Sequence, residues 1–195
     1  MNLINHKPNN QEILLGYDKF FKNIINLYKN KKLPNKILFS GQKGIGKATF
    51  AYHLINYIFS NNEDFSYDIN NCKINNSNKS FKLVQNNSHP NFHLIDLLDD
   101  KKVIEIAQIR KMINYANKSA FNNKERIILI DNAENLNLNS SNALLKITEE
   151  PNDNVFFILI HNSNRKILET LKSRCLIFKI SLTFEQAVVV TNKLL

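Results

Sequence analysis

Apolar residues recur along the chain with two periods, one typical of amphipathic helices and one typical of buried strands. Helical spacing predicts helices at about 12–28, 49–59, 105–117, 140–150, 167–172 and from 183 onward. Short apolar runs predict strands at 36–40, 92–96, 126–131, 155–160 and 176–180. Because strands and helices alternate, the sequence predicts an α/β fold with a parallel sheet, in which ligands gather at the carboxyl ends of the strands.

One stretch departs from this alternation. Residues 61–88 are crowded with Asn, Ser and Lys and hold Cys72 alone. This composition is typical of loops, so we expect a long surface excursion between the second helix and the second strand.

A glycine-rich loop joins the first strand to the helix at 49–59. Its residues spell the phosphate-binding pattern G-x-x-x-x-G-K with Gly41, Gly44, Gly46 and Lys47. In such a loop, backbone N–H groups wrap the phosphates, and the next residue supplies a hydroxyl ligand for Mg²⁺. That residue is Ala48 here, and Thr49 stands one position too late. We expect weak or absent ATP and Mg²⁺ binding; alternatively, the loop is a relic that only shapes the turn.

An acid ends the strand at 126–131. Asp131 follows four apolar residues, an arrangement in which P-loop enzymes direct a carboxylate toward Mg²⁺. A hydrolytic site also requires an acid at the next position, where this chain has Asn132. Asp131 is therefore interpreted equally as a metal-facing group or as a hydrogen-bonding group at the strand end.

The chain is basic. It has 195 residues, with 26 Lys and Arg against 17 Asp and Glu, and its formal charge is +9. Such a field attracts nucleic acid or an acidic protein surface. However, the 33 Asn residues spread along the chain also indicate compositional drift, so a merely solvated basic surface is the alternative.

Cysteine usage and hydropathy indicate where the chain works. Cys72 and Cys175 are distant in sequence and form no C-x-x-C pair, so we expect no disulfide framework and no zinc site. The N-terminus lacks the apolar core of a signal peptide, and the longest apolar run, 155–160, is too short to span a bilayer. These features predict a cytoplasmic protein without membrane contact.

Two later motifs identify a family resemblance. The stretch 142–151, which reads N-A-L-L-K-I-T-E-E-P, and the triplet Ser173-Arg174-Cys175 resemble the clamp-loader branch of the AAA+ superfamily. The loop at Gly41, the His89-Pro90 pair and Asp131-Asn-Ala-Glu occur in the order and spacing of that family. Within the branch, the chain is most similar to the delta-prime family of bacterial DNA polymerase III, whose modules commonly keep the fold without the ATPase residues.

The resemblance implies a P-loop NTPase (AAA+) three-layer fold around a central five-stranded parallel sheet. It implies an AAA+ domain at 1–180, including the 61–88 excursion, and the start of a truncated helical lid at 181–195. It also implies a subunit of the DNA polymerase holoenzyme, with no ATPase activity of its own. Its partners would be tau/gamma and delta subunits, and it would meet the sliding clamp and primed DNA through the complex.

The resemblance further assigns roles to two residues. Arg174 would act in trans, as an arginine finger that reaches the ATP of a neighbouring tau/gamma subunit. Asn162 would occupy the neighbourhood of the sensor that reads the γ-phosphate in active relatives, although an ordinary turn residue is the alternative. The four-cysteine zinc module of some delta-prime relatives cannot form around Cys72, so no zinc is expected.

Two other functions remain open. The chain could be an active ATPase of the tau/gamma type, with Thr49 and Glu134 standing in for the missing groups. It could also be a free-standing nucleic-acid-binding module that exploits the charge of +9, which predicts tight and steeply salt-dependent DNA binding.

Overall fold

The computed structural model describes residues 7–118, 125–149 and 154–194. The chain forms two compact units. One, here called the sheet unit, comprises Pro34–Lys43 and His89–Ile180; the other, the helical unit, comprises the chain up to Leu33, Gly44–Ser88 and Ser181 onward. The glycine-rich loop passes from one to the other.

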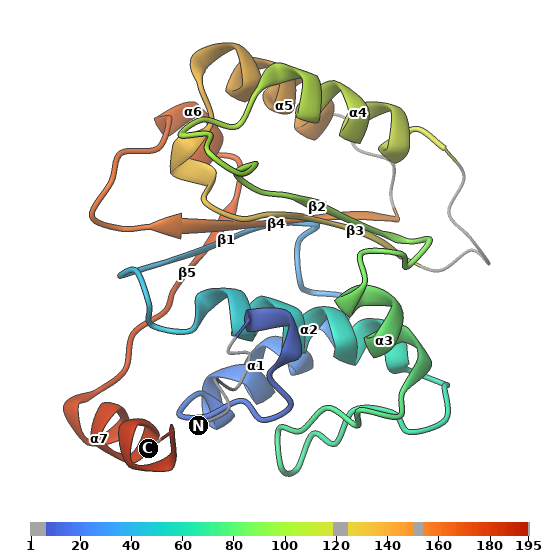
Figure 1. Ribbon diagram of the computed structural model, residues 1–195, viewed down its shortest axis with the longest axis vertical. Helices are drawn as coiled ribbons and strands as arrows, with labels where there is room; N and C mark the ends of the chain where they lie inside the picture. The colour runs from blue at the N-terminus through green and yellow to red at the C-terminus, as the bar shows by residue number, and fades with distance from the viewer. Residues whose placement is uncertain (1–6, 119–124, 150–153, 195) are drawn as a thin grey trace. The chain divides into compact units, whose positions relative to one another are not determined.

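The sheet unit is built on five parallel strands in the order β2-β3-β4-β1-β5. Their bounds are β1 Lys36–Gly41, β2 Phe92–Ile95, β3 Arg126–Ile130, β4 Val155–Asn162 and β5 Leu176–Lys179. Three helices lie together on one face of this sheet (Figure 1): α4 Ile106–Ala116, α5 Leu138–Glu149 and α6 Glu169–Lys172. A 3-10 turn, η3, covers Ala133–Asn135. The predicted α/β fold with a five-stranded parallel sheet is confirmed.

The core of the sheet unit explains the apolar runs in the sequence. All five residues of β3 are buried, as expected for an interior strand of a parallel sheet. Helix α4 buries a stripe at helical spacing that consists of Ile109, Met112 and Ala116. In α5, the buried residues are Leu144 and the small polar residues Ser140, Ser141 and Thr148. Ser140 there donates its hydroxyl to the Ile104 carbonyl over 2.8 Å.

Strand β5 lies at one end of the sheet order, and β1 is its partner. Its side chains are more exposed than those of the other strands: Leu176 is 39% exposed and Ile177 is 37% exposed. An apolar run therefore predicted the strand correctly but did not distinguish this edge from the interior.

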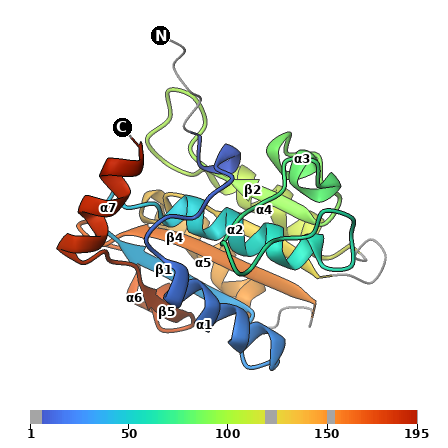
Figure 2. The ribbon, with the colours of Figure 1, turned by 90° about the horizontal axis from the view of Figure 1, so that it is seen from below.

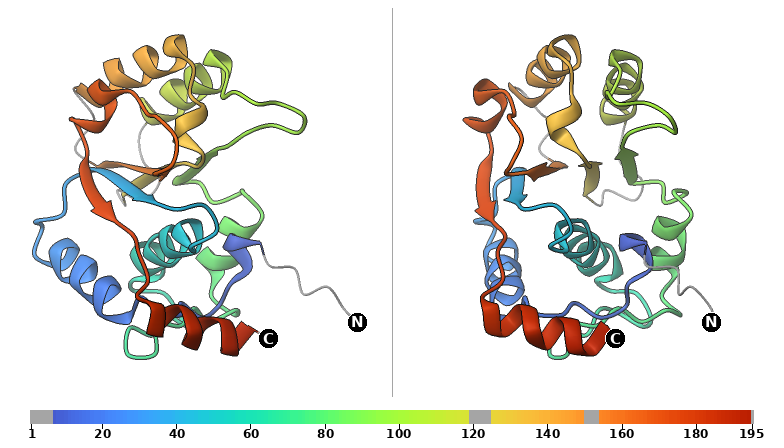
Figure 3. Two further views of the ribbon diagram at one scale, coloured as in Figure 1. Left: turned by 90° about the vertical axis from the view of Figure 1, so that its left-hand side faces the viewer. Right: turned by 60° about the vertical axis from the view of Figure 1, so that its left-hand side comes forward.

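The helical unit contains η1 Pro8–Asn10, α1 Asp18–Lys29, α2 Lys47–Ser60, α3 Lys79–Gln85 and α7 Phe184–Leu194. Helix α2 lies between α1 and α3 (Figure 3) and is buried almost throughout. The segment leading into α1 passes between α2 and α7 (Figure 2). Tyr17 of this segment contacts Phe50 of α2, and Gly16 faces Val190 of α7.

The predicted helix at 12–28 begins only at Asp18. Gly16 has a φ of +81°, and a Cβ at this position would lie 2.9 Å from the side chains of Leu182 and Val190. The backbone therefore turns before the helix starts, and glycine is needed because it tolerates both the positive φ and the close approach.

The expected surface excursion at 61–88 is wrong. This stretch contains α3, and it buries Tyr67, Cys72, Ile74, Phe81 and Val84. Its polar residues make hydrogen bonds within the segment: Asp68 accepts from the backbone amide of Asn70 over 2.9 Å, and Glu63 accepts from the Ser80 hydroxyl over 2.8 Å. Polar composition reflects these turns and caps rather than a lack of structure.

Candidate functional site

Three predicted site residues meet at one edge of the sheet. Gly41 ends β1 and pairs in register with Asn162, which ends β4. Asp131 follows β3, the neighbour of β4 on its other side. Because all three strands are parallel, these residues lie at the carboxyl edge of the sheet, where ligands of α/β proteins bind.

Gly41 has a structural reason to be glycine. A Cβ at this position would lie 2.3 Å from the carbonyl oxygen of Ile180, and the backbone there is pinned because the Ile180 amide donates to Ser40 over 2.8 Å. The first glycine of the motif is therefore required by the contact between β1 and the end of β5, whether or not a nucleotide binds.

Asn162 and Glu134 are engaged with each other. The Asn162 amide donates to the Glu134 carboxylate over 3.0 Å, and the Asn162 side-chain oxygen accepts from the Asn164 amide over 3.2 Å. The second contact is the geometry of an ordinary Asx turn. The Glu134 carboxylate thus holds the end of β4, which places it in a structural role.

Asn132 joins the ends of β2 and β3. Its side-chain amide donates to the Asp96 carboxylate over 2.7 Å, and its backbone amide donates to Asp131 over 2.7 Å. Asn132 also has a φ of 52°, a left-handed conformation that Asn adopts more readily than most residues. The position where a hydrolytic site needs a carboxylate is thus occupied by a neutral amide. Asp96 was not singled out from the sequence, although it stands at the end of the predicted strand 92–96.

From Gly44 onward, the glycine-rich loop lies in the helical unit. Gly44 and Gly46 have φ angles of +83° and +91°, and α2 begins at Lys47, which is 6% exposed. A Cβ on Gly44 would meet no described atom within 4 Å. Open space above a left-handed glycine at a helix N-terminus suits a phosphate.

The metal half of a nucleotide site does not fit these residues. Ala48 offers a methyl group where Mg²⁺ needs a hydroxyl, and Thr49 lies one position further along α2. Within the described ranges, no group of three or more His, Cys, Asp or Glu side chains is placed to hold a metal ion. The loop therefore retains a backbone that suits phosphate, without the side-chain ligand that hydrolysis requires.

Tyr17 braces the loop from within the helical unit. Its hydroxyl donates to the Ile45 carbonyl, and its ring packs edge-on against Phe50 with centroids 5.8 Å apart. Burial raises the pKa of Tyr17 to about 12, so the hydroxyl stays protonated and remains a donor at neutral pH. Sequence reasoning missed this residue because the contact joins positions far apart in the chain.

Removing the Tyr17 hydroxyl is expected to loosen the loop. Tyr17→Phe leaves the Ile45 carbonyl without this donor and should lower the free energy of unfolding by about 1 kcal/mol. Amide exchange at Ile45 and Gly46 should accelerate. Tyr115→Phe is the matched control, because that hydroxyl donates to the Pro90 carbonyl over 2.9 Å in the sheet unit. Unchanged loop exchange in Tyr17→Phe would contradict the bracing role.

Arg174 lies at the opposite edge of the sheet. It precedes β5, whose first residue, Leu176, pairs with Ile37 near the start of β1. Gly41 stands four residues further along β1, which corresponds to about 13 Å at ~3.3 Å per residue. Within the sheet unit, Arg174 is therefore at the amino edge, whereas Gly41, Asp131 and Asn162 are at the carboxyl edge.

The contacts of the Ser173-Arg174-Cys175 triplet explain its local structure. The Ser173 hydroxyl and an Arg174 terminal nitrogen both donate to the carbonyl of Thr170 in α6, over 3.1 Å and 2.9 Å. Cys175 packs against the core, and burial raises the pKa of its thiol to about 11. The triplet therefore closes α6 and anchors the chain through Cys175, while the Arg174 side chain stays 37% exposed.

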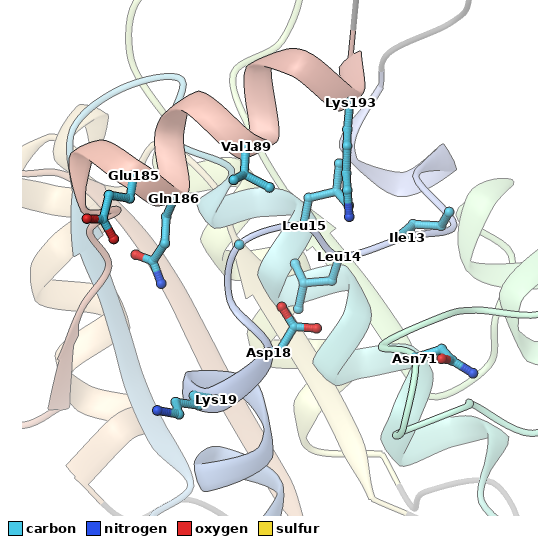
Figure 4. Close-up of a pocket in the computed structure, with 11 residues that line it drawn as sticks. Ile13, Leu14, Leu15, Asp18, Lys19, Asn71, Glu185, Gln186, Val189 and Lys193 are labelled. Carbon is cyan, nitrogen blue, oxygen red and sulfur yellow. The ribbon is translucent and has the colours of Figure 1, made fainter.

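A pocket in the helical unit involves none of the predicted site residues. It has a volume of about 460 Å³ and lies between residues 13–19 and α7 (Figure 4). Its lining mixes Asp18 and Glu185 with Lys19 and Lys193, so no single charge dominates it.

Among the described helices, none is long and apolar enough to cross a membrane.

Comparison with known sequences gives one family over most of the chain. Residues 16–183 match the family described as DNA polymerase III, delta subunit. The DNA polymerase III subunit delta' of Buchnera aphidicola subsp. Schizaphis graminum is 31% identical over 168 residues, which cover 86% of this chain and 49% of that protein. The DNA polymerase III subunit gamma of the same organism is 31% identical over 181 residues, 92% of this chain and 47% of that protein.

Comparison with solved structures agrees on the fold. A gamma subunit-related protein of DNA polymerase III from Thermotoga maritima superposes with a TM-score of 0.56 at 16% identity, covering 87% of this chain and 49% of that one. The chain therefore spans about half the length of the curated relatives it matches.

Proposed function

Because the chain belongs to the DNA polymerase III delta-subunit family, we propose that it is the AAA+ module of a delta-prime-like clamp-loader subunit. In this proposal it helps to load the sliding clamp on primed DNA as part of a ring with tau/gamma and delta subunits. It works in the cytoplasm with the replication machinery, and it contributes to hydrolysis at a neighbouring subunit rather than at its own loop.

The position of Arg174 is the observation that carries this proposal. The residue lies at the edge of the sheet opposite to Gly41 and Asn162, with its side chain 37% exposed. An arginine at that edge is remote from Gly41, where the phosphate-binding pattern of its own chain begins, and is accessible to another chain. A guanidinium directed at a γ-phosphate stabilises the transition state through charge and paired hydrogen bonds.

The residues of the chain's own glycine-rich loop support the proposal that hydrolysis takes place at a neighbouring subunit. Ala48 offers no metal ligand, and the side-chain amide of Asn132 donates a hydrogen bond to Asp96. Gly41 is required by the sheet contact with Ile180, so its presence does not argue for nucleotide. We therefore assign Gly44, Gly46, Lys47 and Thr49 to a degenerate nucleotide site, with Asp131 at the sheet edge in a hydrogen-bonding role.

An ATPase of the tau/gamma type is the second candidate. The 31% identity to a gamma subunit favours it as much as the equal identity to a delta' subunit favours the first. It requires Thr49 and Glu134 to replace the missing groups. Glu134 is bonded to the Asn162 amide, which argues against that replacement.

Turnover by the purified protein separates the two candidates. We expect no ATP hydrolysis above background with Mg²⁺, and no difference between the natural chain and Lys47→Ala, because Ala48 and Asn132 lack the required groups. Phosphate release measured over hours is the readout, with a tau/gamma subunit as the positive control. Hydrolysis that Lys47→Ala abolishes would overturn the proposal and establish the alternative.

A further inference from the structure

Arg174 is held by two acceptors from two different helices. One terminal nitrogen donates to the Thr170 carbonyl over 2.9 Å, and the other donates to the carboxylate of Glu149 over 2.8 Å. Thr170 belongs to α6, and Glu149 is the last residue of α5. The two contacts lie on separate nitrogens, so together they fix both the position and the rotation of the guanidinium plane.

We propose that Glu149 is a positioning residue for Arg174, which orients the guanidinium toward a phosphate group of the neighbouring subunit. This inference rests on the proposed role of Arg174 in trans. Glu149 does not touch the phosphate in this proposal. It acts through the arginine, and the ligand class is the terminal phosphate of a nucleotide held by another chain.

The chemistry of the guanidinium allows both contacts at once. Arginine carries five N–H donors in a rigid fork, and each terminal nitrogen has two. When Thr170 and Glu149 each take one of these, the second N–H on each terminal nitrogen is left to face an incoming phosphate. The side chain is 37% exposed, so a phosphate can approach it without displacing Glu149.

Orientation matters because a free arginine is flexible. If the arginine side chain must be ordered during the reaction, the entropy lost in ordering it adds to the activation free energy. A side chain that is already held in place avoids this cost. The pair itself is half exposed, with Glu149 54% exposed, so its own contribution is modest. The expected effect is therefore a change of about two- to fivefold in rate rather than a complete loss.

The test uses the assembled clamp-loader complex with an ATPase-competent partner facing Arg174. Glu149→Ala should lower kcat per assembled complex by about two- to fivefold, with KM for ATP unchanged within about twofold. Glu149→Gln should retain more than half of the natural kcat, because the amide oxygen still accepts from Arg174. Glu169→Ala is the matched control. It removes the 3.3 Å ion pair between Glu169 and Lys172, which both belong to α6, and should leave kcat unchanged.

A double-mutant cycle separates this inference from the proposed function. If Glu149→Ala lowers kcat in the natural background but leaves the residual rate of Arg174→Ala unchanged, the positioning role is supported. If Arg174→Ala abolishes activity while Glu149→Ala keeps full kcat, or raises it because the carboxylate competes with phosphate, the inference fails and the proposed function stands. A loss of assembly or stability in Glu149→Ala, with kcat per assembled complex unchanged, also overturns it. If Arg174→Ala itself is fully active, both fail.

Discussion

In the proposed clamp-loader complex, replacing Arg174 with alanine is expected to slow ATP hydrolysis at the neighbouring subunit by about 10³- to 10⁵-fold. This corresponds to about 4 to 7 kcal/mol of transition-state stabilisation. The fold itself should be unaffected, because the side chain is partly exposed and its two hydrogen bonds are at the surface. The measurement is single-turnover hydrolysis in a reconstituted complex whose other ATP sites are inactivated at their P-loop lysines.

Two companion variants make this result specific. Arg174→Lys keeps the charge but loses the rigid fork, so it should recover only part of the rate. Lys172→Ala removes a neighbouring cation of α6 that pairs with Glu169, and should hydrolyse ATP normally. A complex with Arg174→Ala that loads clamps at the natural rate would refute the arginine-finger role.

Gly41→Ala is expected to destabilise the protein by roughly 3 kcal/mol or more, a large part of a typical domain stability. The added Cβ would lie 2.3 Å from the Ile180 carbonyl oxygen, which belongs to the backbone and has no rotamer to move aside. Either β1 and the end of β5 separate or the hydrogen bond from Ile180 to Ser40 is lost. Equilibrium unfolding in urea measures the change.

Gly44→Ala is the matched control for that substitution. Gly44 also belongs to the motif, but among the described residues nothing lies within 4 Å of the added Cβ. Only its φ of +83° opposes a side chain, which costs about 1 to 2 kcal/mol. Equal losses in the two variants would mean that the sheet contact is not what requires glycine at position 41.

Features with a local origin were predictable from the sequence. The pattern Thr183-x-x-Gln186 is typical of a capping box at the start of the predicted helix from 183 onward, and both of its hydrogen bonds are present: Thr183 N–H to Gln186 over 2.9 Å and Gln186 N–H to Thr183 over 3.2 Å. The buried strand β3 was predicted because interior parallel strands are apolar on both faces. Such patterns depend on residues only a few positions apart, so they can be recognised in a single sequence.

Contacts between distant elements were not predictable. Asn132 meets Asp96 across 36 positions, and Arg174 meets Glu149 across 25. Whether those side chains meet depends on strand order and on how each helix is placed along the sheet, which no local period encodes. The residues of the phosphate-binding pattern were recognisable one by one, and the role of Lys47 and the trans action of Arg174 stay predictions.

The exposed edge at β5 affects how this protein behaves in concentrated solution. An edge strand with partly exposed Leu176 and Ile177 presents backbone N–H and C=O groups with which another polypeptide could pair. Edge strands of this kind promote self-association. Lys179, which is exposed at the end of the same strand, opposes this by bringing a charge that a stacked copy would have to desolvate. Substituting that lysine with an uncharged β-former is therefore expected to reduce solubility.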